Sequence, residues 1–197
     1  LAPGRIDLGV GKAPGGLPLA TRALQQGLHQ QEKGSFAEQL AQLDNWLSLP
    51  AADEGDDALQ ATPIPPHVAD RFLLGASNES ALLAAQLDWN FVFAAHLNGD
   101  KSLMREVITT WRDHSQRDTL VAVQVIVAAS EAEATELAAQ VEIWGVELEN
   151  GQRVTVASEA QAQAFARQAG SPARLIEQRT RSLIKGTPAT VHAELSA

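Results

Sequence analysis

Residues 71–80 read Arg71-Phe72-Leu73-Leu74-Gly75-Ala76-Ser77-Asn78-Glu79-Ser80. The first half of this run is short and apolar and ends in glycine, which is typical of a β-strand buried on both faces. The second half predicts a turn and then a helix over 79–87, because Ser77 is suited to accept a hydrogen bond from a free backbone N–H of the first helical turn. A buried strand that turns into a helix is the unit from which parallel sheets with crossover helices are built.

The same alternation extends in both directions from this unit. Ser35 with Glu38, and Ser130 with Glu133, have the spacing of a capping box and mark two further helix starts. The sequence predicts strands at 5–11, 71–75, 91–95 and 120–127, and helices at 19–29, 36–49, 79–87, 102–115 and from 130 to about 144. These make about four strand–helix units of an α/β fold.

Two stretches depart from this alternation. Residues 50–66 are acidic and rich in proline, which predicts a surface excursion. After Gly151, the segments 158–168, 172–183 and 187–195 read as helices, with no strand expected between them. Because a closed barrel of this type has eight strand–helix units, we expect residues 1–197 to be a single domain that forms only part of a barrel.

The composition is typical of a soluble globular protein and argues against several functions. With 15 basic and 24 acidic side chains, the formal net charge is −9, which disfavours binding to a nucleic-acid backbone. The chain has no cysteine, so it has neither disulfides nor thiolate metal sites, which fits a reducing cytoplasm. No apolar run reaches the roughly 20 residues of a membrane helix, and no signal peptide is recognisable. We expect a cytoplasmic protein with neither a nucleic-acid nor a membrane partner.

The turn after Gly75 is the first candidate binding site. Free backbone N–H groups at a helix N-terminus bind anions, and the hydroxyls of Ser77 and Ser80 add donors to the first turn. This arrangement fits a phosphate group. The alternative is that Ser77 only caps its own helix while Ser80 faces solvent.

Two further candidates stand at the carboxyl ends of predicted strands, where barrel enzymes bind their ligands. Lys12 is either a ligand-binding cation or a solvated loop lysine, since its segment matches neither a dinucleotide fingerprint nor a Walker loop. His96 is either an acid, a base or a cofactor contact, or a packed histidine bonded to a neighbouring carbonyl. The other histidines lack metal-ligand spacing, so we predict no metal site and a surface position for His29, His67, His114 and His192. We expect core or subunit-contact positions for Trp46, Trp89, Trp111 and Trp144.

Four motifs along the chain resemble those of bacterial luciferase-like flavin-dependent monooxygenases. The segment 3–15 is similar to the family's "PGRIDLGLGRAPG", and 72–85 to its "LLGSS..SA.LAA". The segment 91–96 looks like its "FAFAxH", and 185–191 like its "GTPETV". Each motif is weak alone, but together they follow the family's order and span nearly the whole chain.

The resemblance implies a TIM (β/α)8 barrel, present here as about strands 4–7 with their helices, without the first strands and the last strand. It also implies an enzyme, a flavin monooxygenase that uses reduced FMN and oxygen to oxidise a small organic substrate. Lys12, Ser77 and Ser80 would hold the FMN phosphate, assisted by the amides of Ala76 and Ser77. His96 would lie on the isoalloxazine or substrate side, as the candidate catalytic residue.

The chain departs from the family's pattern at three places. Lys12 stands where arginine is usual, so a bidentate grip on phosphate becomes a point-charge contact. Ala76 replaces a serine and removes one hydroxyl donor. Asp88-Trp89-Asn90 replaces the usual "GLP" and places an indole beside the strand that carries His96.

Two other functions on the same fold stay open, a non-catalytic flavin-binding protein and a deazaflavin-dependent oxidoreductase. The partners that the resemblance implies are a flavin, a small-molecule substrate and, in the monooxygenase case, a flavin reductase. A partial barrel leaves strand edges unpaired and apolar faces uncovered. We therefore expect the chain by itself to be inactive, and either to fold poorly or to form a homo-oligomer.

Overall fold

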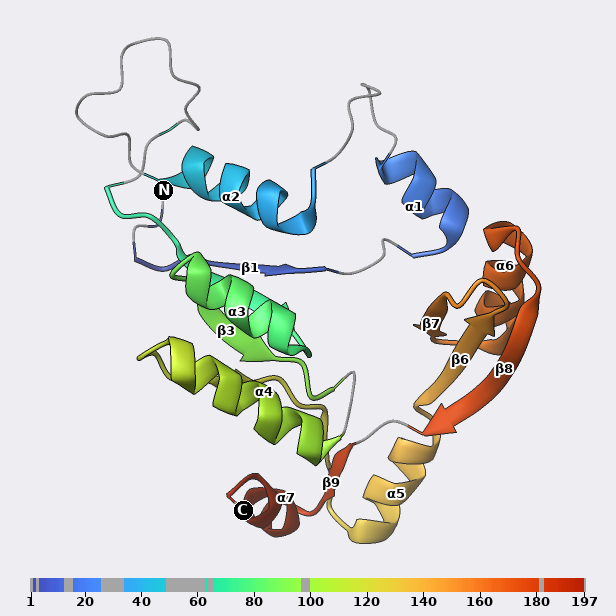
Figure 1. Cartoon of the computed structure of the whole chain (residues 1–197). Coiled ribbons are helices and arrows are strands. Elements are labelled where there is room, and N and C mark those ends of the chain that lie inside the picture. Colours follow the sequence, from blue (N-terminus) through green and yellow to red (C-terminus); the bar gives the residue numbers. More distant parts are fainter. Residues whose placement is uncertain are drawn as a thin grey trace. The chain divides into compact units, whose positions relative to one another are not determined.

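The computed structural model describes residues 2, 4–12, 16–25, 34–48, 63, 66–96, 100–180 and 183–196 (Figure 1). The chain divides into two compact units. The first comprises Leu1–Lys12, Gln31–Ala94 and Asp100–Ala122, and the second comprises Ala13–Gln30, Ala95–Gly99 and Val123–Ala197. The single domain over 1–197 stays a prediction, and the excursion expected at 50–66 lies almost entirely outside the described residues.

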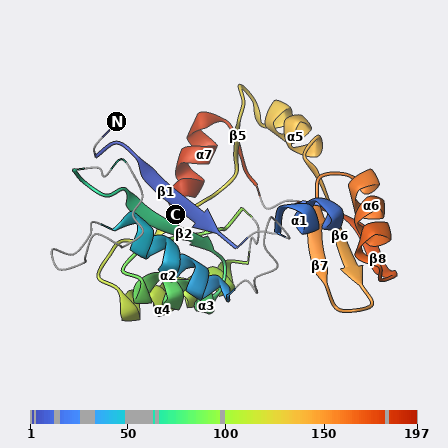
Figure 2. The ribbon, with the colours of Figure 1, turned by 90° about the horizontal axis from the view of Figure 1, so that it is seen from above.

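The first unit is built on a 4-stranded parallel sheet with the strand order β1-β2-β3-β4. The strands are β1 (Asp7–Gly11), β2 (Asp70–Gly75), β3 (Asn90–Phe93) and β4 (Leu120–Val121). Three helices lie on one face of this sheet, namely α2 (Phe36–Leu47), α3 (Asn78–Gln86) and α4 (Lys101–His114) (Figure 2). The predicted α/β alternation is confirmed for this unit.

The core of the first unit lies between the sheet and the helices α3 and α4. Phe91 and Phe93 alternate with the half-buried Asn90 and Val92 along β3, so both rings enter the core. The ring centroids of Phe91 and Trp111 are 5.6 Å apart. Small residues on α3 let its backbone approach the sheet closely. The fully buried side chains here are Leu73, Ala81, Ala84, Phe91, Phe93, Val107 and Trp111.

The second unit contains a parallel pair of strands, each followed by a helix. β5 (Val125–Val127) pairs with β9 (Ile184–Gly186), and the helices are α5 (Glu131–Ala139) and α7 (Pro188–Leu195). The single strand expected at 120–127 is therefore two strands, β4 and β5, one in each unit. The sequence pattern did not predict β9, because three residues are too few to show a period.

The second unit also contains a 3-stranded antiparallel sheet with the order β7-β6-β8. Its strands are β6 (Glu142–Leu148), β7 (Arg153–Val156) and β8 (Ala173–Thr180), and its helix is α6 (Glu159–Ala169). Val146, Leu148, Ala162 and Phe165 form its buried core. Helix α1 (Pro18–Gln25) packs against α6, and the Leu19 amide donates to the Gln168 side chain at 3.2 Å.

Two helix predictions are wrong in this antiparallel sheet. The helix expected to reach about residue 144 ends at Ala139, and the segment expected to be helical at 172–183 contains β8. The alanine, arginine, leucine and glutamate of 173–180 favour a helix locally. Pairing with β6 runs from Glu142 opposite Thr180 to Leu148 opposite Ala173, and this long-range ladder overrides the local preference.

Helix starts agree with the capping prediction. The Ser35 hydroxyl accepts from the Glu38 amide at 3.2 Å, and the Glu38 carboxylate accepts from the Ser35 amide at 2.6 Å, which completes the capping box. Ser130 caps α5 in the same way, while the Glu133 carboxylate accepts from the Ala129 amide. No helix in the part of the chain that the structure describes is long and apolar enough to span a membrane.

Candidate functional site

Lys12 and the Ser77 turn lie at the same edge of the first unit's sheet. β1 and β2 are parallel neighbours, and Gly11 at the end of β1 pairs with Leu74 near the end of β2. Lys12 follows directly after Gly11, and the turn to α3 follows directly after Gly75. Both candidate groups therefore stand at the carboxyl edge, where parallel α/β sheets bind their ligands.

Ser77 and Ser80 form a hydroxyl pair on the first turn of α3. Ser77 is the N-cap, with extended backbone, and its side chain accepts from the Ser80 amide at 3.2 Å. The two Oγ atoms are 3.1 Å apart. Among the described residues, no carboxylate accepts a bond from either hydroxyl. The turn thus combines two hydroxyls with the amides of a helix N-terminus, which is a donor set for an anion.

Gly75 lets Ser80 sit directly over the end of β2. A Cβ on Gly75 would overlap the Ser80 side chain, so no larger residue fits here without moving that serine. Ser80 is half-buried by this packing, whereas Ser77 is exposed. The glycine therefore sets how close the hydroxyl pair lies to the strand end.

The other polar residues of this turn have different roles. The Asn78 side chain donates to the Glu106 carboxylate at 2.6 Å and accepts from the Thr110 hydroxyl at 3.0 Å, which ties α3 to α4. Glu79 is exposed in the first turn and brings a negative charge close to any bound anion. An anion bound at this turn would therefore need a cation from another element to offset the charge of Glu79.

The structure places four of the five predicted site residues in the first unit. Lys12 is exposed and has no ion-pair partner among the described residues. Ala76 and Ser80 are half-buried, and Ser77 is exposed. His96 is half-buried, follows the end of β3 by three residues and belongs to the second unit. That His96 shares one site with the hydroxyl pair stays a prediction.

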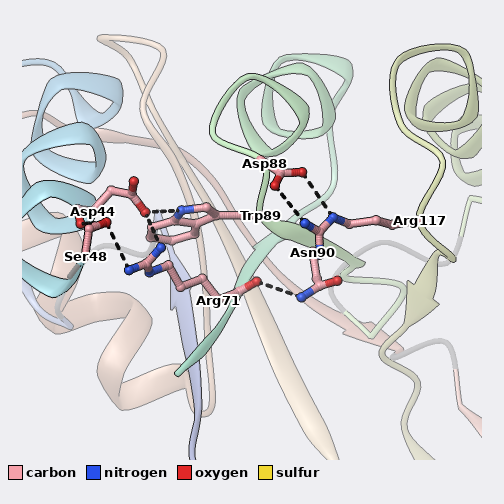
Figure 3. Close-up of polar contacts among 7 residues, drawn as sticks. All are labelled: Asp44, Ser48, Arg71, Asp88, Trp89, Asn90 and Arg117. Carbon is pink, nitrogen blue, oxygen red and sulfur yellow. Dashed lines mark hydrogen bonds and ion pairs between the residues drawn. The ribbon is translucent and has the colours of Figure 1, made fainter. Parts of the chain in front are cut away.

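The segment 88–90 lies at the amino end of β3, opposite to the end that leads to His96. Trp89 is buried, and its Nε1 donates to the Asp44 carboxylate at 2.7 Å (Figure 3). Asp88 has a φ of 55°, a left-handed conformation that glycine adopts freely. Asp88 thus keeps the backbone shape available to the family's usual glycine, and the indole packs inside the unit and not at the ligand edge.

The structure also gives the positions of most of the histidines and tryptophans that the sequence singled out. His67, His114 and His192 are exposed as expected, and His29 lies outside the described residues. Trp89 and Trp111 are core residues, while Trp46 is 41% exposed. Across the described ranges, no cluster of three or more His, Cys, Asp or Glu side chains is arranged to hold a metal ion.

A second turn with the same chemistry, not predicted from the sequence, lies between β9 and α7. Thr187 caps α7, and its Oγ1 lies 3.1 Å from that of Thr190, the same separation as in the serine pair. Here the Glu131 carboxylate accepts from the Thr187 amide at 3.0 Å and from the Thr190 hydroxyl at 2.6 Å. The shared hydroxyl-x-x-hydroxyl spacing after a strand-ending glycine was the available signal. In this protein such a turn does hold an anionic group.

Comparisons with known proteins agree with the four motifs. A relative from Bacillus subtilis (strain 168), named N-acetyl-S-alkylcysteine monooxygenase, is 37% identical over 204 residues, which cover 100% of this chain and 60% of the relative. A protein of Escherichia coli (strain K12), named luciferase-like monooxygenase, is 37% identical over 102 residues, or 51% of this chain and 29% of that protein. The crystal structure of apo-MsnO8 covers 70% of this chain and 40% of its own, with a TM-score of 0.55 and 30% identity. No family model matches the chain.

The similarity to the Bacillus subtilis relative runs through the whole chain, including both units. The chain spans 60% of that relative's length. The resemblance that the motifs predict is therefore confirmed: the chain is related to the luciferase-like flavin-dependent monooxygenases.

Proposed function

We propose that the protein to which this chain belongs is a flavin-dependent monooxygenase, which uses reduced FMN and O2 to oxidise a small organic substrate. Two relatives are named as monooxygenases, one of them 37% identical along the whole chain. The observation that carries the cofactor part is the Ser77–Ser80 hydroxyl pair at the carboxyl edge of the sheet. In this proposal, residues at the carboxyl edge of the sheet bind the phosphate of the flavin.

The corresponding fold is a TIM barrel, to which this chain contributes a part. The parallel order β1-β2-β3-β4 and the parallel pair β5-β9 are both consistent with consecutive barrel strands. Several strand residues keep large apolar side chains exposed, including Val127 at 53% and Leu120 at 48%. Exposed apolar strands favour contact with further protein, so we retain the expectation of an oligomer or of additional barrel strands.

The residues at the edge fit the phosphate of FMN. Ser77 and Ser80 would donate through their hydroxyls, the Ala76 and Ser77 amides would add backbone donors, and Lys12 would supply the positive charge. The bare backbone at Gly75 leaves room for Ser80 beside the strand end. When bound, reduced FMN supplies the electrons that activate oxygen. The chain's own residues hold the phosphate and thereby fix where the ring lies.

His96 is the proposed catalytic residue. It follows a strand end, the position from which barrel enzymes direct side chains toward the ligand. A histidine there is suited to hold or move a proton near neutral pH. Replacement of His96 by glutamine should lower kcat while leaving FMN affinity unchanged, which separates this role from that of the phosphate site.

The decisive experiment is a titration with FMN, with riboflavin in parallel. Quenching of flavin fluorescence should saturate with FMN and not with riboflavin, because only FMN carries the phosphate. Ser80→Ala should weaken FMN binding. Ser158→Ala, which removes the cap of α6 far along the chain, is the matched control and should leave binding unchanged. The titration is made on this chain and on the complete gene product.

Activity is then measured on the complete gene product with reduced FMN and oxygen. N-acetyl-S-alkylcysteines are a reasonable first substrate class, because one relative is named for them. FMN binding without substrate oxidation or oxygen uptake would favour a non-catalytic flavin-binding protein. Equal affinity for FMN and riboflavin in the complete protein would contradict the phosphate site itself.

A further inference from the structure

The second unit has an inserted sheet between two neighbouring strand–helix pairs. β5 and β9 are adjacent and parallel, with Val125 opposite Ile184 and Val127 opposite Gly186. Between them the chain passes through α5 and then through the whole antiparallel sheet β6–β8 (Figure 1). The first turns of α5 and α7 therefore both follow the carboxyl edge of the β5–β9 pair, although the chain between them is long.

Glu131 bridges these two first turns. It is the first residue of α5, and its Oε1 accepts from the Thr187 amide at 3.0 Å and from the Thr190 hydroxyl at 2.6 Å. Gly186 is buried with a φ of 150°, and a Cβ there would lie 2.8 Å from Glu131 Oε2. The glycine thus leaves space for the carboxylate as well as supplying the turn conformation.

The contact is not needed to begin α7. Thr187 already caps that helix, because its side chain accepts from the Thr190 amide, and Pro188 occupies the first turn. The Glu131 contact comes from a residue 56 positions away and adds a negative charge at the positive end of the α7 dipole. The Glu131 contact therefore does more than provide a hydrogen-bond acceptor for the N-terminus of α7: it connects α7 to α5.

We propose that Glu131, Thr187 and Thr190 form a latch that joins the first turns of α5 and α7 at the carboxyl edge of β5–β9. Glu131 is a positioning residue in this latch. The proposal concerns the second unit alone and does not depend on flavin binding.

The latch is closed at neutral pH and opens in acid. The Thr187 amide and then the Thr190 hydroxyl hold the pKa of Glu131 below its usual value of 4.5. The contact is therefore fully present above pH 4.5 and is lost as pH falls through the lowered pKa. Other charged groups on the surrounding elements are Glu133 and Glu136 on α5, Lys185 on β9, and His192 and Glu194 on α7. Glu131→Gln keeps all of these and removes only the one charge.

Hydrogen exchange over residues 183–196, measured from pH 7 to pH 3 and corrected for intrinsic rates, tests the latch in the intact chain. Glu131→Gln should lower protection of this segment at pH 7 by about threefold or more, and should flatten its decline in acid. Glu136→Gln, on the same helix, should behave as the parent. Parent-like protection in Glu131→Gln would overturn the latch, and so would an equal loss in Glu136→Gln.

Two variants at Thr190 distinguish loss of the hydrogen bond from a general loss of folding. Thr190→Val removes the hydroxyl donor at nearly constant volume and should lower protection of 183–196, while Thr190→Ser should retain it. Peptides of α3 and α4 report on the fold of the other unit and should exchange as in the parent. If valine and serine gave the same protection, the hydroxyl contact would have no latching role and the proposal would fail.

Discussion

The indole Nε1 of Trp89 donates a hydrogen bond of 2.7 Å to the Asp44 carboxylate, which also pairs with Arg71 at 2.9 Å (Figure 3). This carboxylate ties α2 to residues at the amino ends of β2 and β3. Trp89 is 1% exposed, so its N–H depends on this carboxylate for a hydrogen bond. Asp44 is thus the shared partner of a buried donor and a largely buried cation.

Replacing Asp44 should destabilise the first unit. Asp44→Ala leaves the Trp89 N–H without its acceptor and the Arg71 guanidinium, whose side chain is 15% exposed, without its counter-charge. We expect a loss of about 2 kcal/mol in the free energy of unfolding, measured by urea denaturation. Asp113→Ala, at an exposed position of α4, is the control and should change stability little. Equal stability of the two variants would show that the network contributes nothing.

Gly75 should tolerate no side chain. Gly75→Ala places a methyl group on top of Ser80, so either the strand end or the first turn of α3 must shift. We expect about 2 kcal/mol of destabilisation, together with weaker FMN binding. Gly9→Ala on the neighbouring strand is the matched control, because nothing lies within 4 Å of its added Cβ. A Gly75→Ala protein with unchanged stability and affinity would disprove the close approach of Ser80.

The charge at residue 12 should control FMN affinity. Lys12→Ala should weaken FMN binding about tenfold, and Lys12→Arg should strengthen it, because a guanidinium grips phosphate with two parallel hydrogen bonds. Lys101→Ala removes an exposed lysine of the same unit and should have little effect. Fluorescence titrations at low and high salt provide the measurement. If Lys12 and Lys101 variants bound alike, Lys12 would not contact the phosphate.

Asp88 should be replaceable by glycine more easily than by alanine. Its φ of 55° costs an alanine about 1 kcal/mol, whereas glycine adopts this region freely. The ion pair with Arg117 contributes little to this comparison, because the Asp88 side chain is 86% exposed. We therefore expect Asp88→Gly to be the more stable of the two variants in thermal unfolding. The reverse order would mean that the ion pair outweighs the backbone conformation.

Two exposed carboxylates should make stability fall in acid. Hydrogen bonds from the Ser35 hydroxyl and amide lower the pKa of Glu38, as those from Thr187 and Thr190 lower that of Glu131, both from 4.5. Because these pKa values are depressed in the folded state, their stabilisation is present above pH 4.5 and disappears as pH falls through the lowered values. The double variant Glu38→Gln/Glu131→Gln should show a smaller drop in Tm between pH 5 and pH 3 than the parent. An unchanged drop would assign the acid sensitivity to other groups.

Features that depend on neighbouring residues could be predicted from the amino-acid sequence. The apolar run ending at Gly75, the cap at Ser77 and the capping box of Ser35 with Glu38 all depend on interactions within a few residues. For this reason the strand–turn–helix unit and the position of its hydroxyl pair were predictable. The family resemblance was predictable as well, since it rests on short motifs in a fixed order.

Features that depend on partners far apart in the sequence could not be predicted and were seen only in the folded chain. Residues 173–180 have a helical composition and become a strand because β6 offers them a hydrogen-bonded ladder. In the sequence, Glu131 looks like an ordinary acidic residue in the first turn of a helix. Thr187 and Thr190 come within hydrogen-bonding distance of it only because β5 and β9 are neighbouring strands. The local hydrophobic pattern does not indicate which strands are neighbours in a sheet. Contacts between distant residues, such as that of Glu131 with Thr187, therefore depend on how the whole unit packs.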